Sequence, residues 1–136
     1  MLIKEAQKIV GGLSKPGKMP GPAINLPASA CKTGVKLAQI EGTPCFGCYA
    51  LKLRYTWPAT IKAMARRLAA LTNPLWVQAM TTLTKRARWF RWHDSGDVQS
   101  HKHMNDILTV AKNSPNTGHW MPTQERQFLP ELAAVP

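Results

Sequence analysis

The sequence predicts an α/β domain in which a small parallel sheet is covered by helices. Several segments repeat their apolar residues with the spacing of a helix, and shorter aromatic or β-branched segments alternate with them. Strands and helices that alternate over short connections form parallel βαβ units. The 136 residues, of which 44% are hydrophobic, suffice for one moderate core, so we expect a single domain over residues 1–136.

The N-terminal part is expected to hold a helix and a proline-rich arm. The apolar residues of segment 2–10 fall on one side of a helix, which the glycine pair after it would end. Residues 13–27 contain four prolines and two glycines, so we expect an extended arm of polyproline II character that lies across the domain. A short strand over 35–40 and a short helix over 49–54 are expected to follow.

Helix and strand signals alternate through the rest of the chain. Pro58 and Pro74 each follow a residue that can cap a helix, and each would occupy its first turn. Ser100 can cap another helix, and the aromatic-rich segment 88–93 favours a strand. We therefore expect helices over about 57–71, 73–86, 100–112 and 123–132, and strands over 88–93 and 119–121.

The charge is strongly positive and unevenly distributed. The chain has 18 Lys and Arg against 7 Asp and Glu, a formal net charge of +11. Residues 1–93 carry +13 and residues 94–136 carry −2, as counted along the sequence. This asymmetry favours a polyanionic partner such as nucleic acid, an acidic protein surface or a phosphorylated ligand, although a solvated basic face is the simpler alternative. The residues expected to bind this partner are Lys52, Arg54, Lys62, Arg66, Arg67, Lys85, Arg86, Arg88 and Arg91.

Three cysteines form the first candidate site. Cys45 and Cys48 are three residues apart at a turn, and Cys31 lies upstream. Thiolates at this spacing can hold either tetrahedral zinc, with a histidine as fourth ligand, or an iron–sulfur cluster with one open iron. A lone CxxC pair beside a buried thiol is the alternative without a metal.

The second candidate site follows the strand expected over residues 88–93. Ligands bind beyond the carboxyl ends of parallel strands, and Asp94, Ser95, Gly96 and Asp97 follow this strand directly. Gly96 permits a close backbone approach, and the carboxylates of Asp94 and Asp97 can accept hydrogen bonds from an ammonium or a hydroxyl group. The alternative is a turn followed by a helix cap.

Five sequence blocks together resemble the phage "gene product 88" family. They are Met19-Pro-Gly-Pro-Ala, Asn25-Leu-Pro-Ala, Cys45-x-Gly-Cys48-Tyr-Ala-Leu-Lys, Phe90-Arg-Trp-His-Asp-Ser-Gly-Asp97 and His119-Trp-Met-Pro-Thr123, with Cys31 between the second and third. The resemblance spans about residues 17–125 and implies a phage or prophage origin more firmly than an activity.

A more distant similarity is to the N-terminal half of radical SAM enzymes. Those enzymes place three cysteines after their first barrel strand and a GGE-like motif after the second. The similarity implies a partial radical-SAM-like barrel in which Cys31, Cys45 and Cys48 bind a [4Fe–4S] cluster, and Asp97 faces the methionine moiety of S-adenosylmethionine. This chain departs from that pattern, because thirteen residues separate Cys31 from Cys45 and only half a barrel is present, which a second copy would have to complete.

Two functions follow from these observations. The first is a metal- or [4Fe–4S]-binding, radical-SAM-like protein of unknown reaction with a basic surface. The second is a phage inhibitor without enzymatic activity that docks nucleic acid or a host defence ribonucleoprotein, as an anti-CRISPR protein does. The sequence contains neither an apolar run of the roughly 20 residues that span a membrane nor a signal peptide, so we expect a protein of the bacterial host cytoplasm.

Overall fold

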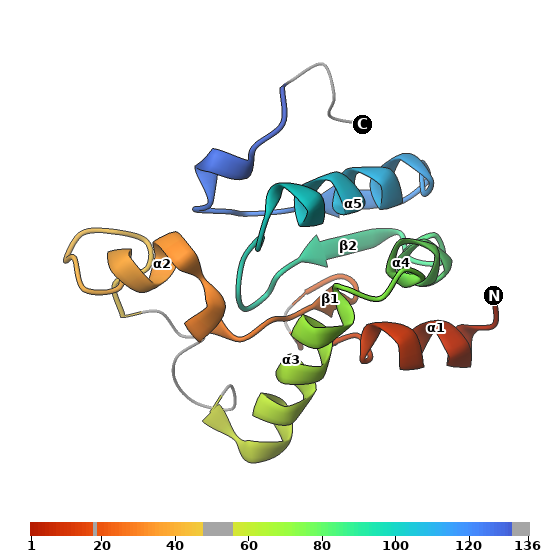
Figure 1. Cartoon of the computed structure of the whole chain (residues 1–136), viewed down its shortest axis with the longest axis horizontal. Helices are drawn as coiled ribbons and strands as arrows, with labels where there is room; N and C mark the ends of the chain where they lie inside the picture. The colour runs from red at the N-terminus through yellow and green to blue at the C-terminus, as the bar shows by residue number, and fades with distance from the viewer. Residues whose placement is uncertain (18, 48–55, 132–136) are drawn as a thin grey trace.

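The computed structural model describes residues 1–17, 19–47 and 56–131 (Figure 1). Its helices are α1 (Ile3–Val10), α2 (Lys32–Leu37), α3 (Pro58–Ala70), α4 (Trp76–Thr84) and α5 (His101–Lys112). Its strands are β1 (Ala23–Ile24), β2 (Trp89–Trp92) and β3 (Gly118–Trp120), and short 3₁₀ helices cover Ala28–Ala30 and Arg126–Phe128.

The three strands form one parallel sheet in the order β1-β2-β3. Ile24 pairs with Trp92, and Arg91 pairs with Trp120 on the other side. The expected α/β class and the parallel sheet are therefore confirmed, with a small open sheet of three strands. A barrel is not shown, because β1 and β3 have no further strand beside them among the described residues.

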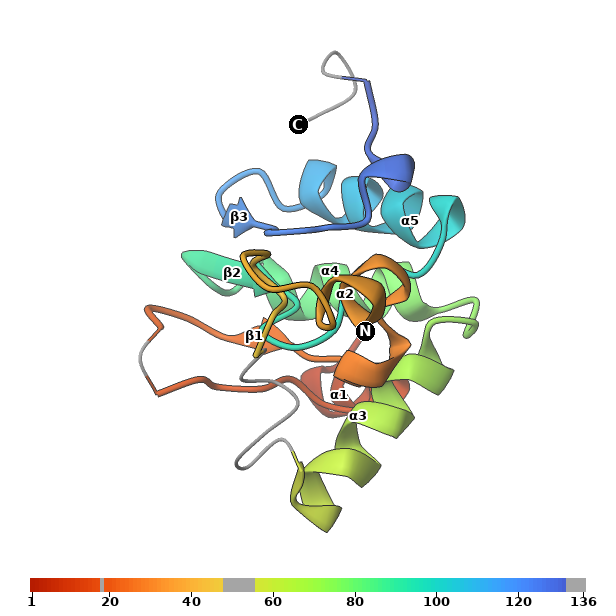
Figure 2. The same ribbon diagram turned by 90° about the vertical axis from the view of Figure 1, so that its left-hand side faces the viewer.

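Helices α1, α4 and α5 pack on one face of this sheet (Figure 2). Because side chains alternate along β2, Phe90 and Trp92 point into this layer and are only 1% exposed. They join a core that includes Val10, Trp76 and Ile107. Helix α2 stands instead over the ends of the strands, beside the loop that carries Cys45 (Figure 2).

Local signals explain most of the helices. Helix α1 ends where Gly11 adopts the left-handed conformation, with a φ of 84°. Helix α3 begins with Pro58 at its first turn, and Ser100 caps α5 by accepting a hydrogen bond from the backbone nitrogen of His103. Asn73 accepts a hydrogen bond from the backbone nitrogen of Leu75 just before α4.

Three expectations for local structure were wrong. Segment 35–40 does not form a strand: its first half belongs to helix α2 and its second half is a turn, because hydrogen bonds from Thr33 to Glu125 hold the first turn of this helix. Within the arm 13–27, Ala23 and Ile24 form the first strand, because two consecutive buried residues can pair with β2 where no proline interrupts them. The helix expected over 123–132 is reduced to the 3₁₀ turn Arg126–Phe128 in its described part. The helix expected over 49–54 lies outside the described residues.

None of the helices described in the structure is both long and apolar enough to cross a membrane.

Candidate functional site

A cavity of about 260 Å³ opens where the parallel strands end, and it is lined by the second candidate site and by the two described thiols of the first. Cys31 and Cys45 line it, together with the run of residues from His93 to Asp97. Thr123 and Gln124, which follow β3, close a third side. Residues distant in sequence meet here because the carboxyl ends of parallel strands lie at the same edge of a sheet.

The sulfur atoms of the two described thiols both lie close to Gly34. Cys31 is the residue immediately before α2, and Gly34 belongs to the first turn of that helix. A Cβ atom added to Gly34 would lie 3.5 Å from the sulfur of Cys45 and 3.7 Å from the sulfur of Cys31. The absence of a side chain at position 34 therefore lets both thiols approach the same side of α2.

The third predicted thiol, Cys48, lies outside the described residues. Within residues 1–17, 19–47 and 56–131, no three His, Cys, Asp or Glu side chains are grouped closely enough to hold a metal ion. The metal-ligating role of Cys31, Cys45 and Cys48 therefore stays a prediction, of which the structure describes two members in one cavity.

Glu125 fixes the thiol loop, the segment from Cys31 to Cys45, to the rest of the fold. Its carboxylate accepts hydrogen bonds from the backbone nitrogen of Thr33 at 2.6 Å, from the hydroxyl of Thr33 at 3.0 Å and from the side-chain amide of Gln127 at 2.6 Å. Burial opposes the ionisation of this side chain, which is 0% exposed, but the hydrogen bonds outweigh that effect and lower its pKa below the ordinary 4.5. The carboxylate thus joins the segment after β3 to the first turn of α2, next to Cys31.

His93 is a strained and buried member of the cavity wall. It is the only non-glycine residue with a positive φ, 67°, among the described residues. Burial, together with the nearby His103 and Arg91, holds the pKa of His93 well below its usual 6.5, so its imidazole is neutral. Neither ring nitrogen has a hydrogen-bond partner in the described part of the chain. Backbone strain and buried nitrogens without a hydrogen-bond partner are typical of residues at ligand-binding sites.

The four residues after His93 divide between structural roles and the cavity. Asp97 accepts hydrogen bonds from the backbone nitrogens of Val98 and Gln124, each at 2.8 Å, and from the hydroxyl of Thr123. Its carboxylate therefore holds the segment after β3 in place. Gly96 has a φ of 80°, and an added Cβ would lie 2.6 Å from the Cβ of Leu26.

Asp94 and Ser95 are the residues of this run that are best placed to meet a ligand. Both line the cavity, and they are 5% and 3% exposed. The hydroxyl oxygen of Ser95 is buried and has no hydrogen-bond partner among the described residues. The carboxylate of Asp94 accepts a hydrogen bond from the hydroxyl of Ser14 at 3.1 Å.

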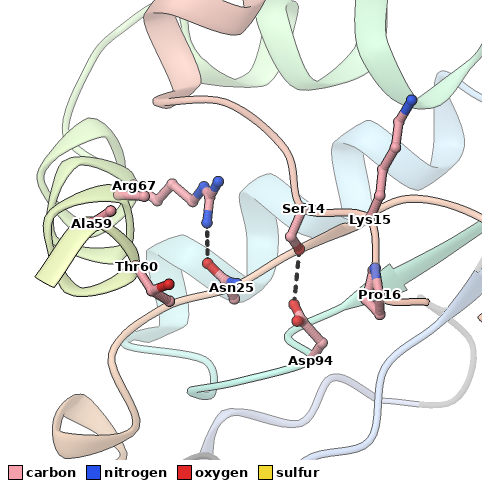
Figure 3. A pocket seen from close by; sticks show the side chains of 9 residues that line it. Ser14, Lys15, Pro16, Asn25, Ala59, Thr60, Arg67 and Asp94 are labelled. Carbon is pink, nitrogen blue, oxygen red and sulfur yellow. Dashed lines mark hydrogen bonds between the residues drawn. The ribbon is translucent and has the colours of Figure 1, made fainter. Parts of the chain in front are cut away.

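Asp94 also borders a second cavity, of about 310 Å³, between the proline-rich arm and α3 (Figure 3). Arg67 enters this cavity from α3 and donates hydrogen bonds to the side-chain oxygen of Asn25 and, at 2.9 Å, to the carbonyl of Gly12. Burial lowers the pKa of Arg67, and the charge of Asp94 partly offsets this effect. The guanidinium therefore joins the arm to α3 within the fold.

The position of Arg67 corrects one part of the predicted basic surface. Arg67 is only 7% exposed and faces the interior, because it forms the buried stripe of α3 together with Met64. Five of the other predicted residues are exposed, namely Lys62, Arg66, Lys85, Arg86 and Arg88, and Arg91 is partly buried. Lys52 and Arg54 lie outside the described residues.

The remaining histidines have other surroundings. His119 accepts a hydrogen bond from the indole nitrogen of Trp92 at 3.1 Å, and its second nitrogen lies 3.0 Å from the hydroxyl oxygen of Ser114. His101 is exposed and packs edge-on against Phe128. His103 lies behind His93, with 5.3 Å between the ring centroids. Of the four histidines considered as a fourth metal ligand, His93 alone lines the thiol cavity.

Sequence reasoning missed the structural roles of Glu125 and Asn25, and it placed Arg67 on the basic surface. An acid and an arginine in amphipathic or loop segments read as solvated residues when no partner is known. The Asn25-Leu-Pro block is a signal that could have singled out Asn25, whereas Glu125 is one of five acidic residues in segment 94–136 and has no comparable signal.

Comparison with known proteins gives one match. No curated protein and no solved structure matches the chain. The family model described as gene product 88 matches residues 1–136, the whole chain. The sequence blocks that line the cavity and the arm are those on which the resemblance to this phage family rests, and the chain belongs to the gene product 88 family.

Proposed function

We propose that this gene product 88 protein holds a thiol-bound metal centre at the C-terminal edge of its sheet, beside a pocket for a small polar ligand. The observation that supports the proposal is the single cavity that Cys31 and Cys45 share with residues His93 to Asp97. Cys48 is the third thiolate of this centre by sequence prediction, as it follows Cys45 at the spacing of metal-binding turns.

The donor atoms of the site fit a thiophilic metal. Thiolates favour iron–sulfur clusters, zinc and copper(I) over hard cations. The neutral, unpartnered imidazole of His93 is in the form that ligates metals, which would complete a set of three thiolates and one imidazole for zinc. We favour a [4Fe–4S] cluster, which three thiolates can hold while one iron stays open to a small molecule.

The polar wall of the cavity suits a ligand with an amine or hydroxyl group. Asp94 supplies a carboxylate that also accepts a hydrogen bond from Ser14, and Ser95 supplies an unpartnered hydroxyl. S-adenosylmethionine is the ligand that the resemblance to radical SAM enzymes implies, and the carboxylates that follow β2 would accept hydrogen bonds from its amino group.

The test is an absorption spectrum of the protein purified without oxygen. We expect a brown protein with the broad absorbance near about 400 nm that is typical of a cluster. This absorbance should be lost in each of the variants Cys31→Ser, Cys45→Ser and Cys48→Ser. The variant Ser29→Ala is the matched control, because Ser29 is exposed and lies two residues before Cys31. A colourless protein that holds one zinc would mean that the metal centre is zinc and not a cluster. A protein without metal under these conditions would overturn the proposal.

A second candidate function is the binding of a polyanion by the basic surface, either nucleic acid or a host defence ribonucleoprotein. It is supported by the exposed side chains of Lys62, Arg66, Lys85, Arg86 and Arg88. Binding through such contacts releases counterions, so the affinity should fall steeply with salt. Phosphate contacts weaken between about 50 and 200 mM salt. An affinity for labelled nucleic acid that does not change over this range would count against this candidate.

A further inference from the structure

One face of the sheet has no helix on it among the described residues, and it carries exposed tryptophans. Phe90 and Trp92 point toward α1, α4 and α5, so Trp89 and Arg91, which alternate with them along β2, point the opposite way. Trp120 on β3 pairs with Arg91 and is 56% exposed. Trp89 is 48% exposed, although tryptophans in a sheet are more often part of a core.

The backbone around Trp89 is shaped to hold its ring against the sheet. Gly118 pairs with Trp89 across the strands. A Cβ atom on Gly118 would lie 2.3 Å from ring atom Cε3 of Trp89, and a Cβ on Gly21 would lie 2.3 Å from the carbonyl oxygen of Trp89. The indole therefore lies against the backbone of Gly118, in space that the side chain of any other residue would fill, and Trp89 remains 48% exposed.

Guanidinium groups lie beside both indoles. The guanidinium of Arg91 is 4.7 Å from the ring centroid of Trp120, and that of Arg88 is 5.8 Å from the ring centroid of Trp89. Neither segment 85–93 nor segment 118–123 contains an acidic residue. The open face therefore combines flat aromatic rings with positive charge, and Met19–Pro22 of the arm border it through a small groove.

We propose that this face binds single-stranded nucleic acid, with bases stacked on Trp89 and Trp120 and phosphates contacted by Arg88 and Arg91. Aromatic side chains on neighbouring strands of an open sheet are a recurrent platform for unpaired bases. A duplex does not fit, because its bases are stacked on one another and present only their edges and phosphates. The inference rests on the second candidate function and specifies its ligand and its contact residues.

The experiment is fluorescence anisotropy with a labelled 12-nucleotide single strand, as DNA and as RNA, and with the duplex of the same sequence. Alanine substitution at a stacking aromatic costs about 1–3 kcal/mol per base, so Trp89→Ala and Trp120→Ala should each weaken single-strand binding by about 5- to 160-fold. Trp89→Phe and Trp120→Phe keep a flat ring and should lose less. Trp57→Ala is the matched control, because Trp57 is 62% exposed and precedes α3, away from this face.

A second pair of variants separates charge from stacking. Arg91→Lys keeps the charge but loses the planar group beside Trp120, so it should weaken binding while the salt dependence stays the same. Arg88→Ala should lower the slope of log affinity against log salt by about one. Circular dichroism and the melting temperature of each variant show whether the fold is intact.

The outcomes distinguish this inference from the function on which it rests. Preference for the single strand, with losses in the two Trp→Ala variants and none in Trp57→Ala, supports the platform. Equal binding of single strand and duplex, unchanged in folded Trp89→Ala and Trp120→Ala, overturns the platform and leaves the polyanion-binding function standing. No binding of any nucleic acid at low salt overturns the platform and also removes nucleic acid from the second candidate function.

Discussion

Removal of the Glu125 carboxylate should loosen the thiol loop and destabilise the whole fold. This side chain is fully buried and accepts three hydrogen bonds, two of which join it to Thr33 across the fold. Hydrogen bonds to a charged group contribute about 1.5–3 kcal/mol each, and partners left unpaired in the interior add a cost. Because the three bonds share one carboxylate, we expect Glu125→Ala to cost about 3–5 kcal/mol and Glu125→Gln about 1–3 kcal/mol.

The assay is urea unfolding followed by circular dichroism at pH 7, with Glu131→Gln as the matched control. Glu131 is exposed, so its substitution should change the free energy of unfolding by less than about 0.5 kcal/mol. The pKa of Glu125 is lowered in the folded state, so the unfolded state binds the proton more tightly. Its contribution is therefore complete above the unfolded pKa of about 4.5 and is lost as the pH falls below that value.

Two results would refute this account of Glu125. One is a Glu125→Ala protein as stable as Glu131→Gln at pH 7. The other is a difference in the free energy of unfolding between wild type and Glu125→Gln that stays constant as the pH falls from 7 to below about 4, where a carboxyl group with a lowered pKa titrates. Either would mean that the carboxylate does not carry the link between α2 and the segment after β3.

Three further predictions concern residues that line one of the two cavities or lie directly behind one. Burial lowers the pKa of His103 to about 4, so the folded protein loses free energy of unfolding as the pH falls from 6.5 toward 4 and the unfolded state takes up the proton. His103→Asn keeps an acceptor for the backbone nitrogen of Gln99. In urea titrations this variant should reduce the loss of stability between pH 8 and pH 5 by about 2 kcal/mol. Gly96→Ala should lower stability by about 2–4 kcal/mol because of its positive φ and its contact with Leu26, whereas Gly17→Ala, with open space around it, should not lower the melting temperature. Arg67→Lys should cost about 1–3 kcal/mol by the same unfolding assay, because an ammonium cannot donate to Gly12 and Asn25 in the same geometry, and Arg66→Lys is the exposed control.

The sequence indicated the fold where the local signals are strong. Pro58 and Ser100 placed helix starts, and the alternating aromatic segment around Phe90 placed the central strand. The first strand was missed because Ala23 and Ile24 pair with β2 only through tertiary contact, and two residues carry no periodicity of their own. Helix α2 was missed for the same reason, since it depends on Glu125, 92 residues from Thr33.

The candidate site was foreseen in its members but not in its supports. Cys31, Cys45, Asp94 and Ser95 were identified as two separate groups, and the structure places them in one cavity. Chemistry-bearing residue types and their spacing can be read from a sequence, whereas Arg67 could not be assigned to the interior without its partner Asn25. The exposure of Trp89 could not be read from the sequence either, because it depends on a sheet face that no helix covers among the described residues.

The metal content of the chain tests the central claim most directly. Elemental analysis by mass spectrometry should be run on the wild-type protein purified without oxygen and on the double variant Cys31→Ser, Cys45→Ser. We predict about four irons per chain in the wild type, the content of one [4Fe–4S] cluster, and almost none in a double variant that stays folded. Equal metal content in the two proteins, or none in either, would contradict the assignment of these thiols to a metal centre.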